Sequence, residues 1–196
     1  LNVGGEEIRR SYSICSNPYT DNELRVAVKE VKDGKGSTMI NRNLKVGDNV
    51  EVMTPMGNFY SLLSGANKKH YVLFAGGSGI TPMMSIIKSV LYVEKQSRIT
   101  LIYANRDEAS VIFGTELIKL QELNTEKLNA HFVYDTPKNP VDALYSGMLT
   151  AEKVGAMLEK FQLQSADEIF ICGPGPLMET IKNVLKDKKV KEEKVH

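Results

Sequence analysis

The sequence predicts an α+β protein of two domains: a partial antiparallel β-barrel over residues 1–66, then an α/β domain with a parallel sheet over residues 67–196. Three observations support this prediction. Short segments separated by turns fill the first part of the chain. After about residue 67, continuous apolar runs alternate with segments of helical pattern. The length of 196 residues suffices for two small domains.

The first part of the chain has the pattern of β-strands joined by turns. Residues 7–15 and 23–31 are two expected strands, separated by the turn-rich segment 16–22. A third strand is expected over residues 49–54, with a turn on each side. Short strands at this spacing favour a small antiparallel barrel. Because the segment is short for a closed barrel, we expect one or two strands ahead of Leu1.

The second part of the chain alternates strands with helices. The expected strands are residues 71–75, 99–103, 130–134 and 168–172, and the expected helices are residues 82–94, 116–123, 151–161 and 177–186. Continuous apolar runs are typical of strands that are buried on both faces. Regular alternation of strands and helices therefore predicts a parallel sheet wrapped by helices.

Composition and charge exclude several classes of function. The net charge of +1 favours neither nucleic acid nor an anionic membrane surface as a partner. No apolar run is long enough for a membrane span, so we expect no membrane insertion and a cytoplasmic location. Cys15 and Cys172 are too few for an iron–sulfur cluster, which needs about four thiolates. The three histidines lack metal-ligand spacing, so no metal site is expected.

The run Arg10-Ser11-Tyr12-Ser13 places a cation and an aromatic ring on one expected strand. Arg10 and Tyr12 have the same parity, so both side chains point to one face. A guanidinium binds phosphate oxygens in pairs, and a tyrosine ring stacks on planar groups. Ser13 falls on the other face, with a hydroxyl and an amide free to donate. The alternative is an ordinary exposed arginine beside a half-buried tyrosine.

Residues 34–39 combine glycines with hydroxyl side chains. Gly36 allows a close approach of the backbone, and Ser37 is a good residue to cap a helix. The N-terminus of a helix favours anions, so a phosphate could rest on the amides near Ser37 and Thr38. The alternative is a common glycine turn capped by a serine.

The loop Gly77-Ser78-Gly79-Ile80-Thr81-Pro82 follows a buried strand and opens a helix. Thr81 is the expected N-cap, and Pro82 suits the first helical position. Such a glycine-rich loop at the carboxyl end of a parallel strand is where α/β sheets bind phosphates. The standard dinucleotide fingerprint is not present, because Pro82 replaces its third glycine. The alternative is a tight turn between strand and helix.

Two further strand ends carry candidate site residues. Cys172-Gly173-Pro174 ends the fourth strand with the same geometry, although a buried thiol is the simpler interpretation of the cysteine. Asn105 and Arg106 end the second strand, and an arginine there can pair with a 2′-phosphate. A solvent-exposed loop arginine is an equal alternative, and the acids at 107 and 108 weaken the phosphate interpretation.

Taken in order, these motifs resemble the ferredoxin–NADP reductase superfamily, and most closely the reductase components of bacterial multicomponent oxygenases such as the phenylacetyl-CoA oxygenase type. The resemblance implies an FAD-binding barrel at 1–66 and a NAD(P)-binding domain at 67–196. The residues implied for FAD are Arg10, Tyr12, Ser13, Val28, Lys29, Gly36, Ser37 and Thr38. The residues implied for the nicotinamide nucleotide are Gly77, Gly79, Thr81, Pro82, Asn105, Arg106, Cys172, Gly173 and Pro174.

The resemblance also implies a reaction. A hydride passes from NADPH or NADH to FAD, with Ser13 near the flavin N5 and Cys172 near the nicotinamide C4. Single electrons then pass to an iron–sulfur domain or a ferredoxin-like protein that serves an oxygenase. NADPH is slightly favoured because of Arg106. Alternatives are a haem or cytochrome acceptor, and a nucleotide-binding regulatory module without turnover.

Overall fold

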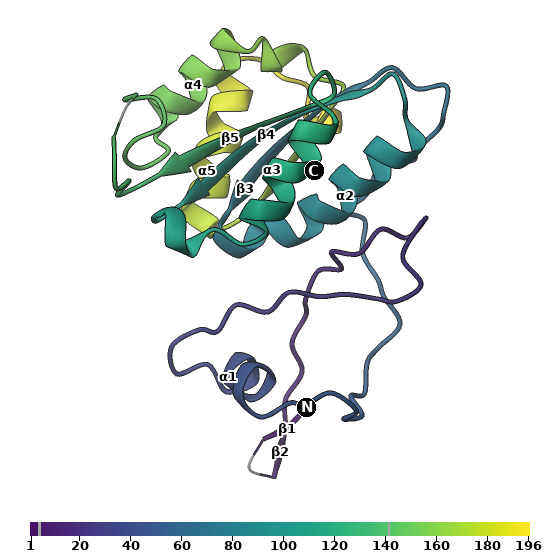
Figure 1. Cartoon of the computed structure of the whole chain (residues 1–196). Helices are drawn as coiled ribbons and strands as arrows, with labels where there is room; N and C mark the ends of the chain where they lie inside the picture. The colour runs from purple at the N-terminus through teal and green to yellow at the C-terminus, as the bar shows by residue number, and fades with distance from the viewer. Residues whose placement is uncertain (4, 141) are drawn as a thin grey trace.

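The computed structural model describes residues 1–3, 5–140 and 142–196. Two parts of the chain differ in character (Figure 1). The α/β part, residues 70–196, forms the layered body in the upper half of the view. The N-terminal part, residues 1–69, hangs below it as extended chain around one short helix. The boundary lies close to the change of pattern in the sequence.

A parallel sheet of four strands forms the centre of the α/β part, in the order β5-β4-β3-β6. The strands are β3 (His70–Gly76), β4 (Arg98–Asn105), β5 (Leu128–Tyr134) and β6 (Glu168–Cys172). Every neighbouring pair is parallel, which confirms the predicted sheet. The chain moves outward from β3 to β5 and then returns to pair β6 with β3. The strand order therefore reverses beside β3, where sheets of this type bind ligands.

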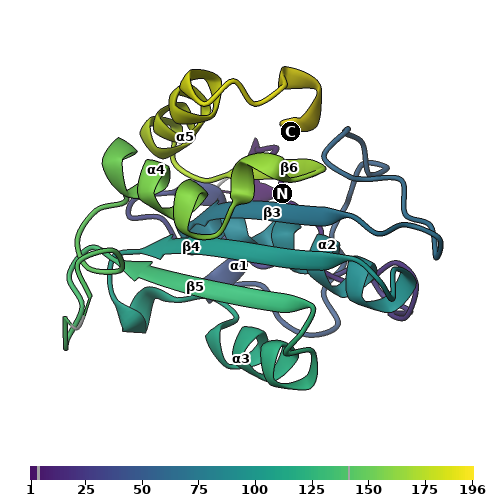
Figure 2. The ribbon, with the colours of Figure 1, turned by 90° about the horizontal axis from the view of Figure 1, so that it is seen from above.

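Helices cover both faces of the sheet, giving three layers (Figure 2). The helices are α2 (Ile80–Val93) and α3 (Gly114–Leu123) on one face, and α4 (Ala151–Lys160) and α5 (Gly175–Asp187) on the other. Single 3-10 turns lie at Gly77–Gly79, Glu108–Ser110, Leu163–Ser165 and Glu192–Lys194. Alternate strand residues fill the two layers, as Leu73 in one and Phe74 in the other show. The predicted helices and strands of this part are confirmed, with bounds that differ by a few residues.

Glycines bring the ends of β3 and β6 into contact. A Cβ atom on Gly79 would lie 2.1 Å from the carbonyl oxygen of Cys172, well inside any allowed distance. A Cβ on Gly173 would lie 3.0 Å from the Gly76 Cα atom. Side chains at these positions would therefore force the two strand ends apart. The two glycine loops that the sequence predicts as one site meet because neither carries a Cβ.

The N-terminal part does not form the strands that the sequence predicts at 7–15, 23–31 and 49–54. Its regular elements among the described residues are β1 (Asn2–Val3), β2 (Glu6–Glu7) and α1 (Lys35–Arg42). The first two predicted strands do run antiparallel, but they meet at a single bridge between Ile14 and Val26. The prediction of these three strands is wrong, and the barrel is not confirmed.

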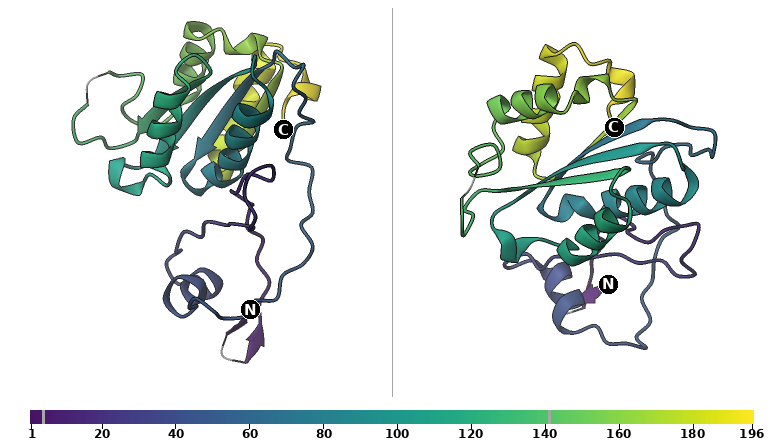
Figure 3. Two further views of the ribbon diagram at one scale, coloured as in Figure 1. Left: turned by 45° about the vertical axis from the view of Figure 1, so that its right-hand side comes forward. Right: turned by 45° about the horizontal axis from the view of Figure 1, so that its top comes forward.

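The physical reason is a lack of partners among the described residues. A strand is held by hydrogen bonds to a neighbour and by burial of one face. The segment from 44 to 62 has no strand partner among the described residues, and most of its apolar side chains, such as Val46, Val52 and Met56, are exposed. Figure 3 (left) shows this segment as extended chain that runs beside the rest of the N-terminal part and leads to β3.

Apolar contacts join the two parts. Cys15 is buried in the cluster between the sheet and α2, and Ala27 and Leu63 pack against it. Phe59 meets Phe170 of β6 edge to face, with ring centroids 5.1 Å apart. The N-terminal part is therefore anchored on the same side of the sheet as α2 and α3.

A buried carboxyl group, Glu94, fixes the linker that leads into β3. Its donors are the Tyr71 hydroxyl at 3.1 Å, the Ser97 hydroxyl at 2.6 Å, the Asn67 amide at 2.5 Å and the Ser64 backbone N–H at 3.1 Å. Burial raises the pKa of Tyr71 well above its usual range, so this hydroxyl remains a donor at neutral pH. The linker, the start of β3 and the end of α2 are thus held by one side chain.

A second carboxyl group, Glu168 at the start of β6, holds the linker from the other side. It accepts from the Ser61 hydroxyl at 2.7 Å and pairs with the Lys69 ammonium group. The end of the chain lies at the free edge of the same strand, where the His196 carbonyl accepts from the Ile171 N–H at 3.0 Å. The linker therefore reaches the sheet through polar contacts on two strands.

We expect Glu94→Ala to lower the free energy of unfolding by about 3 kcal/mol, because several buried donors lose their acceptor. Urea unfolding followed by circular dichroism measures the change. Glu116→Ala is the control, since the Glu116 carboxylate is half exposed and pairs with Lys88. Loss of this surface pair should cost less than about 1 kcal/mol. Equal effects of the two substitutions would contradict the role given to Glu94.

Gly79→Ala should destabilise the protein by about 3 kcal/mol, because the new methyl group overlaps the Cys172 carbonyl. Gly155→Ala on α4 is the matched control, since no atom lies within 4 Å of its added Cβ. This control should be neutral or stabilising by about 0.5–1 kcal/mol, because alanine favours a helix interior. Thermal unfolding of both variants tests the contact. A Gly79→Ala protein as stable as the parent would show that the two loops do not touch.

Candidate nucleotide and flavin site

The first glycine loop leads directly into α2. Gly77 has a positive φ of 51°, and the turn Gly77–Gly79 passes into the helix at Ile80. Gly79 is the N-cap, and Thr81 is the second helical residue, donating to the Ser78 carbonyl at 3.0 Å. The prediction that Thr81 caps the helix and Pro82 begins it is therefore wrong. The 3-10 turn starts the helix earlier than the sequence pattern indicates.

This geometry still suits a phosphate. The first turn of a helix has N–H groups without intrahelical partners, and the helix dipole favours an anion there. Thr81 and Pro82 are buried beneath the loop, so they fix its shape. The loop stands at the carboxyl end of β3, next to the reversal of strand order.

The second loop lies beside the first. Cys172 ends β6, opposite Ala75 of β3, and Gly173 packs against Gly76. Pro174 is the N-cap of α5. Burial raises the pKa of the Cys172 thiol, so the thiol stays protonated at neutral pH. A protonated thiol fits a residue that shapes the site and is not a nucleophile.

The end of β4 completes this edge of the sheet. The Tyr103 hydroxyl donates to the Gly77 carbonyl at 3.0 Å, which ties the strand to the first glycine loop. Asn105 is buried with 5% of its surface exposed, and Arg106 is exposed. The Arg106 guanidinium donates to Asp107 at 3.0 Å. The structure thus brings the predicted residues together at the carboxyl ends of β3, β4 and β6.

Sequence reasoning missed Tyr103, which it treated only as the end of an apolar strand. The signal for its role is a hydroxyl at the carboxyl end of a strand that is otherwise apolar. Burial raises the pKa of Tyr103 to about 12, so it is a donor at neutral pH.

In the N-terminal part, Arg10 and Tyr12 lie against the start of α1. A Cβ atom on Gly36 would meet the Arg10 Cγ atom at 3.1 Å and the Tyr12 hydroxyl at 3.8 Å. The three predicted residues therefore come together at the start of α1. Because Gly36 has no side chain, Arg10 packs directly against the start of α1, and its Nη1 donates to the Arg9 carbonyl at 2.7 Å.

Ser37 is not the N-cap that the sequence predicts. Gly34 is the N-cap, and Ser37 is the third residue of α1. The Ser37 hydroxyl accepts from the Val31 N–H at 3.0 Å, so it closes the preceding turn. The Thr38 N–H already donates to the Gly34 carbonyl at 3.0 Å. The amides left for an anion are those of residues 35–37, one or two residues earlier than predicted.

Three predicted flavin residues remain, namely Val28, Lys29 and Ser13. The Val28 carbonyl accepts from Asn41 of α1 at 3.2 Å, which holds Val28 beside the helix, and Lys29 is exposed. Ser13 is exposed, and no hydrogen bond joins it to Cys172 in the part of the chain that the structure describes. The two residues assigned to hydride transfer thus lie in different parts of the molecule.

Other kinds of site find no support in residues 1–3, 5–140 and 142–196. These residues contain no helix long and apolar enough to cross a membrane. They also contain no group of three or more His, Cys, Asp or Glu side chains that could hold a metal ion.

Two family models match the chain. Residues 73–183 match the oxidoreductase NAD-binding domain, and residues 1–60 match the oxidoreductase FAD-binding domain. The chain is 36% identical over 195 residues to a component of the 1,2-phenylacetyl-CoA epoxidase of Escherichia coli, covering 98% of this chain and 54% of that protein. It is 38% identical over 190 residues to the ferredoxin reductase component of 3-ketosteroid-9-alpha-monooxygenase of Mycobacterium tuberculosis, covering 96% of this chain and 49% of that protein.

Solved structures share the fold. The Amycolatopsis cytochrome P450 reductase aligns with a TM-score of 0.83 at 23% identity, covering 100% of this chain and 57% of that one. The cytochrome b5 reductase domain of Ulva prolifera nitrate reductase aligns with a TM-score of 0.78 at 25% identity, covering 95% and 75%. The chain spans about half the length of the two curated relatives above. From its two domains and these relatives, the chain belongs to the ferredoxin–NADP reductase superfamily and is similar to the reductase components of oxygenases.

Proposed function

We propose that this chain is the flavin and nucleotide module of an oxygenase reductase. It takes a hydride from NAD(P)H onto FAD and passes single electrons to an iron–sulfur acceptor of the ferredoxin type. Residues 1–66 form the FAD domain and residues 67–196 the NAD(P) domain in this proposal. The two matched family models, which cover 1–60 and 73–183, support that division.

The observation that carries the proposal is the meeting of two glycine loops at the reversal of strand order. Gly79 and Cys172 are in contact, and the loop of β3 enters α2 with its amides toward the edge of the sheet. Open α/β sheets bind dinucleotides at this position. A second helix start, that of α1, carries Arg10 and Tyr12.

These residues fit FAD because Arg10 and Tyr12 lie against the start of α1 at Gly36. Arg10 offers a bidentate cation for the pyrophosphate, and the amides of 35–37 offer neutral donors. Tyr12 offers an aromatic face for stacking. When bound, FAD supplies the conversion of a two-electron hydride into two single electrons. The chain's own contribution is to bind and orient, because hydride transfer requires no acid or base.

The residues near the nucleotide act through shape. Gly77 and Gly79 let the backbone approach a phosphate, and Cys172 limits the space at the end of β6 with a protonated thiol. The iron–sulfur acceptor is supported by the name of the mycobacterial relative, a ferredoxin reductase component. A cytochrome acceptor would use the same two binding sites, so the acceptor must be tested directly.

The visible absorption spectrum tests the proposal. The protein is mixed with FAD, freed of unbound flavin, and then reduced anaerobically with NADH or NADPH. We expect a retained flavin band that bleaches on addition of the nucleotide. The reduced protein should then pass electrons to a ferredoxin-type protein faster than to a b-type cytochrome. If no flavin is retained, the proposed oxidoreductase function is rejected, and a nucleotide-binding regulatory module becomes the better interpretation.

Arg10→Ala should weaken FAD binding by at least about tenfold, because a charge-assisted contact contributes about 1.5–3 kcal/mol. Arg9→Ala is the matched control. Arg9 has the opposite parity, is exposed, and pairs with Glu7 at 2.9 Å. Fluorescence quenching of FAD on titration with each variant gives the affinities. Equal affinity in both variants would remove Arg10 from the flavin site.

A further inference from the structure

The turn after β4 lies where sheets of this type distinguish NAD from NADP. This inference rests on the proposed function, since it concerns the same nucleotide site. In doubly wound sheets, the residues after the second strand meet the adenosine ribose. A carboxylate there accepts from the 2′-hydroxyl of NAD, whereas an arginine favours the 2′-phosphate of NADP. Here β4 is that strand, and Ala104 lies level with Gly76 of β3.

Asn105 shows that this turn is built for a ligand. Its side chain is 5% exposed, and neither amide atom has a hydrogen-bond partner among the residues that the structure describes. The amide nonetheless lies near enough to the Tyr103 hydroxyl to oppose the rise in the pKa of that phenol. A buried amide without partners is costly, and a ribose hydroxyl can satisfy both its donor and its acceptor.

Arg106 already has an ion-pair partner. Its Nε donates to the Asp107 carboxylate at 3.0 Å. Its backbone is held as well, because the carbonyl accepts from the Thr136 N–H at 2.8 Å and from the Thr136 hydroxyl at 3.1 Å. A phosphate that recruits Arg106 must therefore draw it from its neighbour.

Asp107 cannot move out of the way. Its second oxygen accepts from the Ser110 N–H at 2.8 Å and caps the 3-10 turn Glu108–Ser110. The Ser110 hydroxyl in turn accepts from the Asp107 N–H at 3.2 Å. The Arg106 guanidinium and the Ser110 contacts lower the pKa of Asp107, so the carboxylate is charged at neutral pH. Rotation of this side chain would cost the cap.

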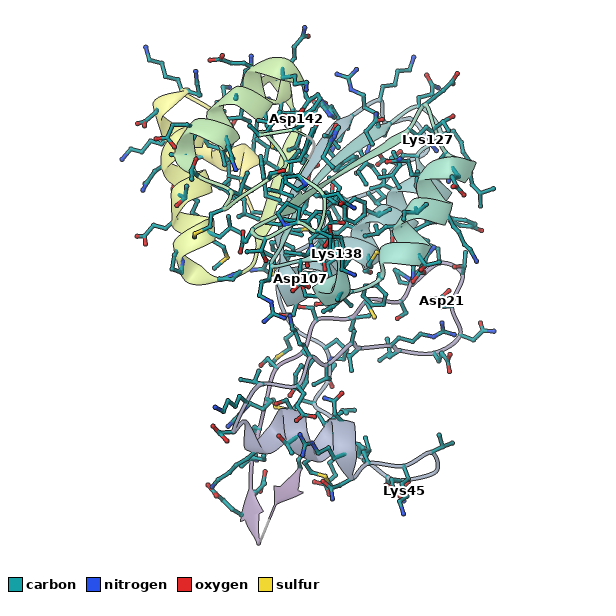
Figure 4. All side chains as sticks on the ribbon, turned by 60° about the vertical axis from the view of Figure 1, so that its left-hand side comes forward. Asp21, Lys45, Asp107, Lys127, Lys138 and Asp142 are labelled. Carbon is teal, nitrogen blue, oxygen red and sulfur yellow. The ribbon has the colours of Figure 1, made fainter. Side chains whose placement is uncertain are left out.

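Further acids surround the turn. Glu108 accepts from the Lys138 N–H at 3.0 Å with one oxygen, while its other oxygen is buried without a partner in the described part of the chain. Figure 4 shows Asp107 and Lys138 at the side of the α/β part that faces the N-terminal part. Burial raises the pKa of Asp135, and Lys153 opposes this rise. A 2′-phosphate would add negative charge to a turn that already carries several carboxyl groups.

We propose that Asp107 makes this module select NADH over NADPH. Its fixed carboxylate accepts from the ribose 2′-hydroxyl, repels a 2′-phosphate, and holds Arg106 in an ion pair. Asn105 supplies the neutral donor and acceptor beside it. This preference is the opposite of the one that Arg106 suggests in the sequence alone.

Binding of NAD⁺ and NADP⁺ to the protein by isothermal titration calorimetry tests the proposal. The fragments 5′-AMP and 2′,5′-ADP serve as probes for the adenosine end alone. We expect NAD⁺ to bind at least about tenfold more tightly than NADP⁺. Asp107→Asn keeps the cap acceptor and removes the charge, so it should reduce this ratio to about threefold or less, mainly through tighter NADP⁺ binding.

Two controls separate the possible causes. Glu122→Gln on the exposed surface of α3 makes the same change in net charge and should leave the ratio unchanged. Arg106→Ala removes the ion pair but keeps the Asp107 carboxylate, so the preference for NAD⁺ over NADP⁺ should persist. Because Asp107→Asn could also lose stability, thermal unfolding of each variant is recorded with the titrations, and Arg106→Ala gives a reading that does not depend on the cap.

The outcomes are distinguishable. Failure of all four compounds to bind would reject the proposed function itself. Binding with NADP⁺ equal to or tighter than NAD⁺, or a tenfold loss of NADP⁺ affinity in Arg106→Ala without any effect of Asp107→Asn, would overturn the selection by Asp107 and leave the nucleotide site intact.

Discussion

The contact between Gly79 and the Cys172 carbonyl is the constraint on which the nucleotide site depends. Without side chains at Gly76, Gly79 and Gly173, the ends of β3 and β6 close on one another at the reversal of strand order. Two loops that are more than ninety residues apart in sequence then act as one surface. The Tyr103 hydroxyl extends this surface to β4 through the Gly77 carbonyl. The ends of β3, β4 and β6 then lie together as the surface that the proposed function assigns to the nucleotide.

The position of the N-terminal part depends on a different kind of contact. Its link to the sheet combines an apolar anchor, where Phe59 meets Phe170, with buried polar bonds around Glu94. The apolar anchor is nondirectional, whereas the carboxyl bonds specify where the linker enters β3. Hydride transfer requires a flavin and a nicotinamide held in one geometry. In the proposed function, these linker contacts set where the N-terminal part stands relative to the nucleotide loops.

The sequence predicted the α/β part well, because its two central strands, β3 and β4, are buried on both faces and their apolar runs carry the signal. The strand predicted at 71–75 is β3 (His70–Gly76) in the structure. The N-terminal part was predicted poorly. An alternating pattern indicates which face of a strand would be buried, but it does not indicate whether a neighbouring strand is present. Whether residues 49–54 form a strand depends on a neighbour, and none lies beside them among the described residues. The motifs supplied the candidate site residues, but both helix starts were misplaced, since Gly34 and Gly79 are the N-caps where Ser37 and Thr81 were expected.

Arg106 shows why motif residues alone cannot assign a ligand. An arginine after the second strand favours a 2′-phosphate when its guanidinium is free. When the guanidinium is paired with a carboxylate, that carboxylate repels the phosphate. An exposed ion pair between adjacent residues is weak by itself and would yield to a phosphate. Here the acid of that pair also caps the turn Glu108–Ser110, so its charge is fixed in place by backbone bonds. The discrimination against phosphate then comes from the immobility of Asp107 and only secondarily from the ion pair. Sequence neighbours reveal the pair, but only the fold reveals that one member cannot move.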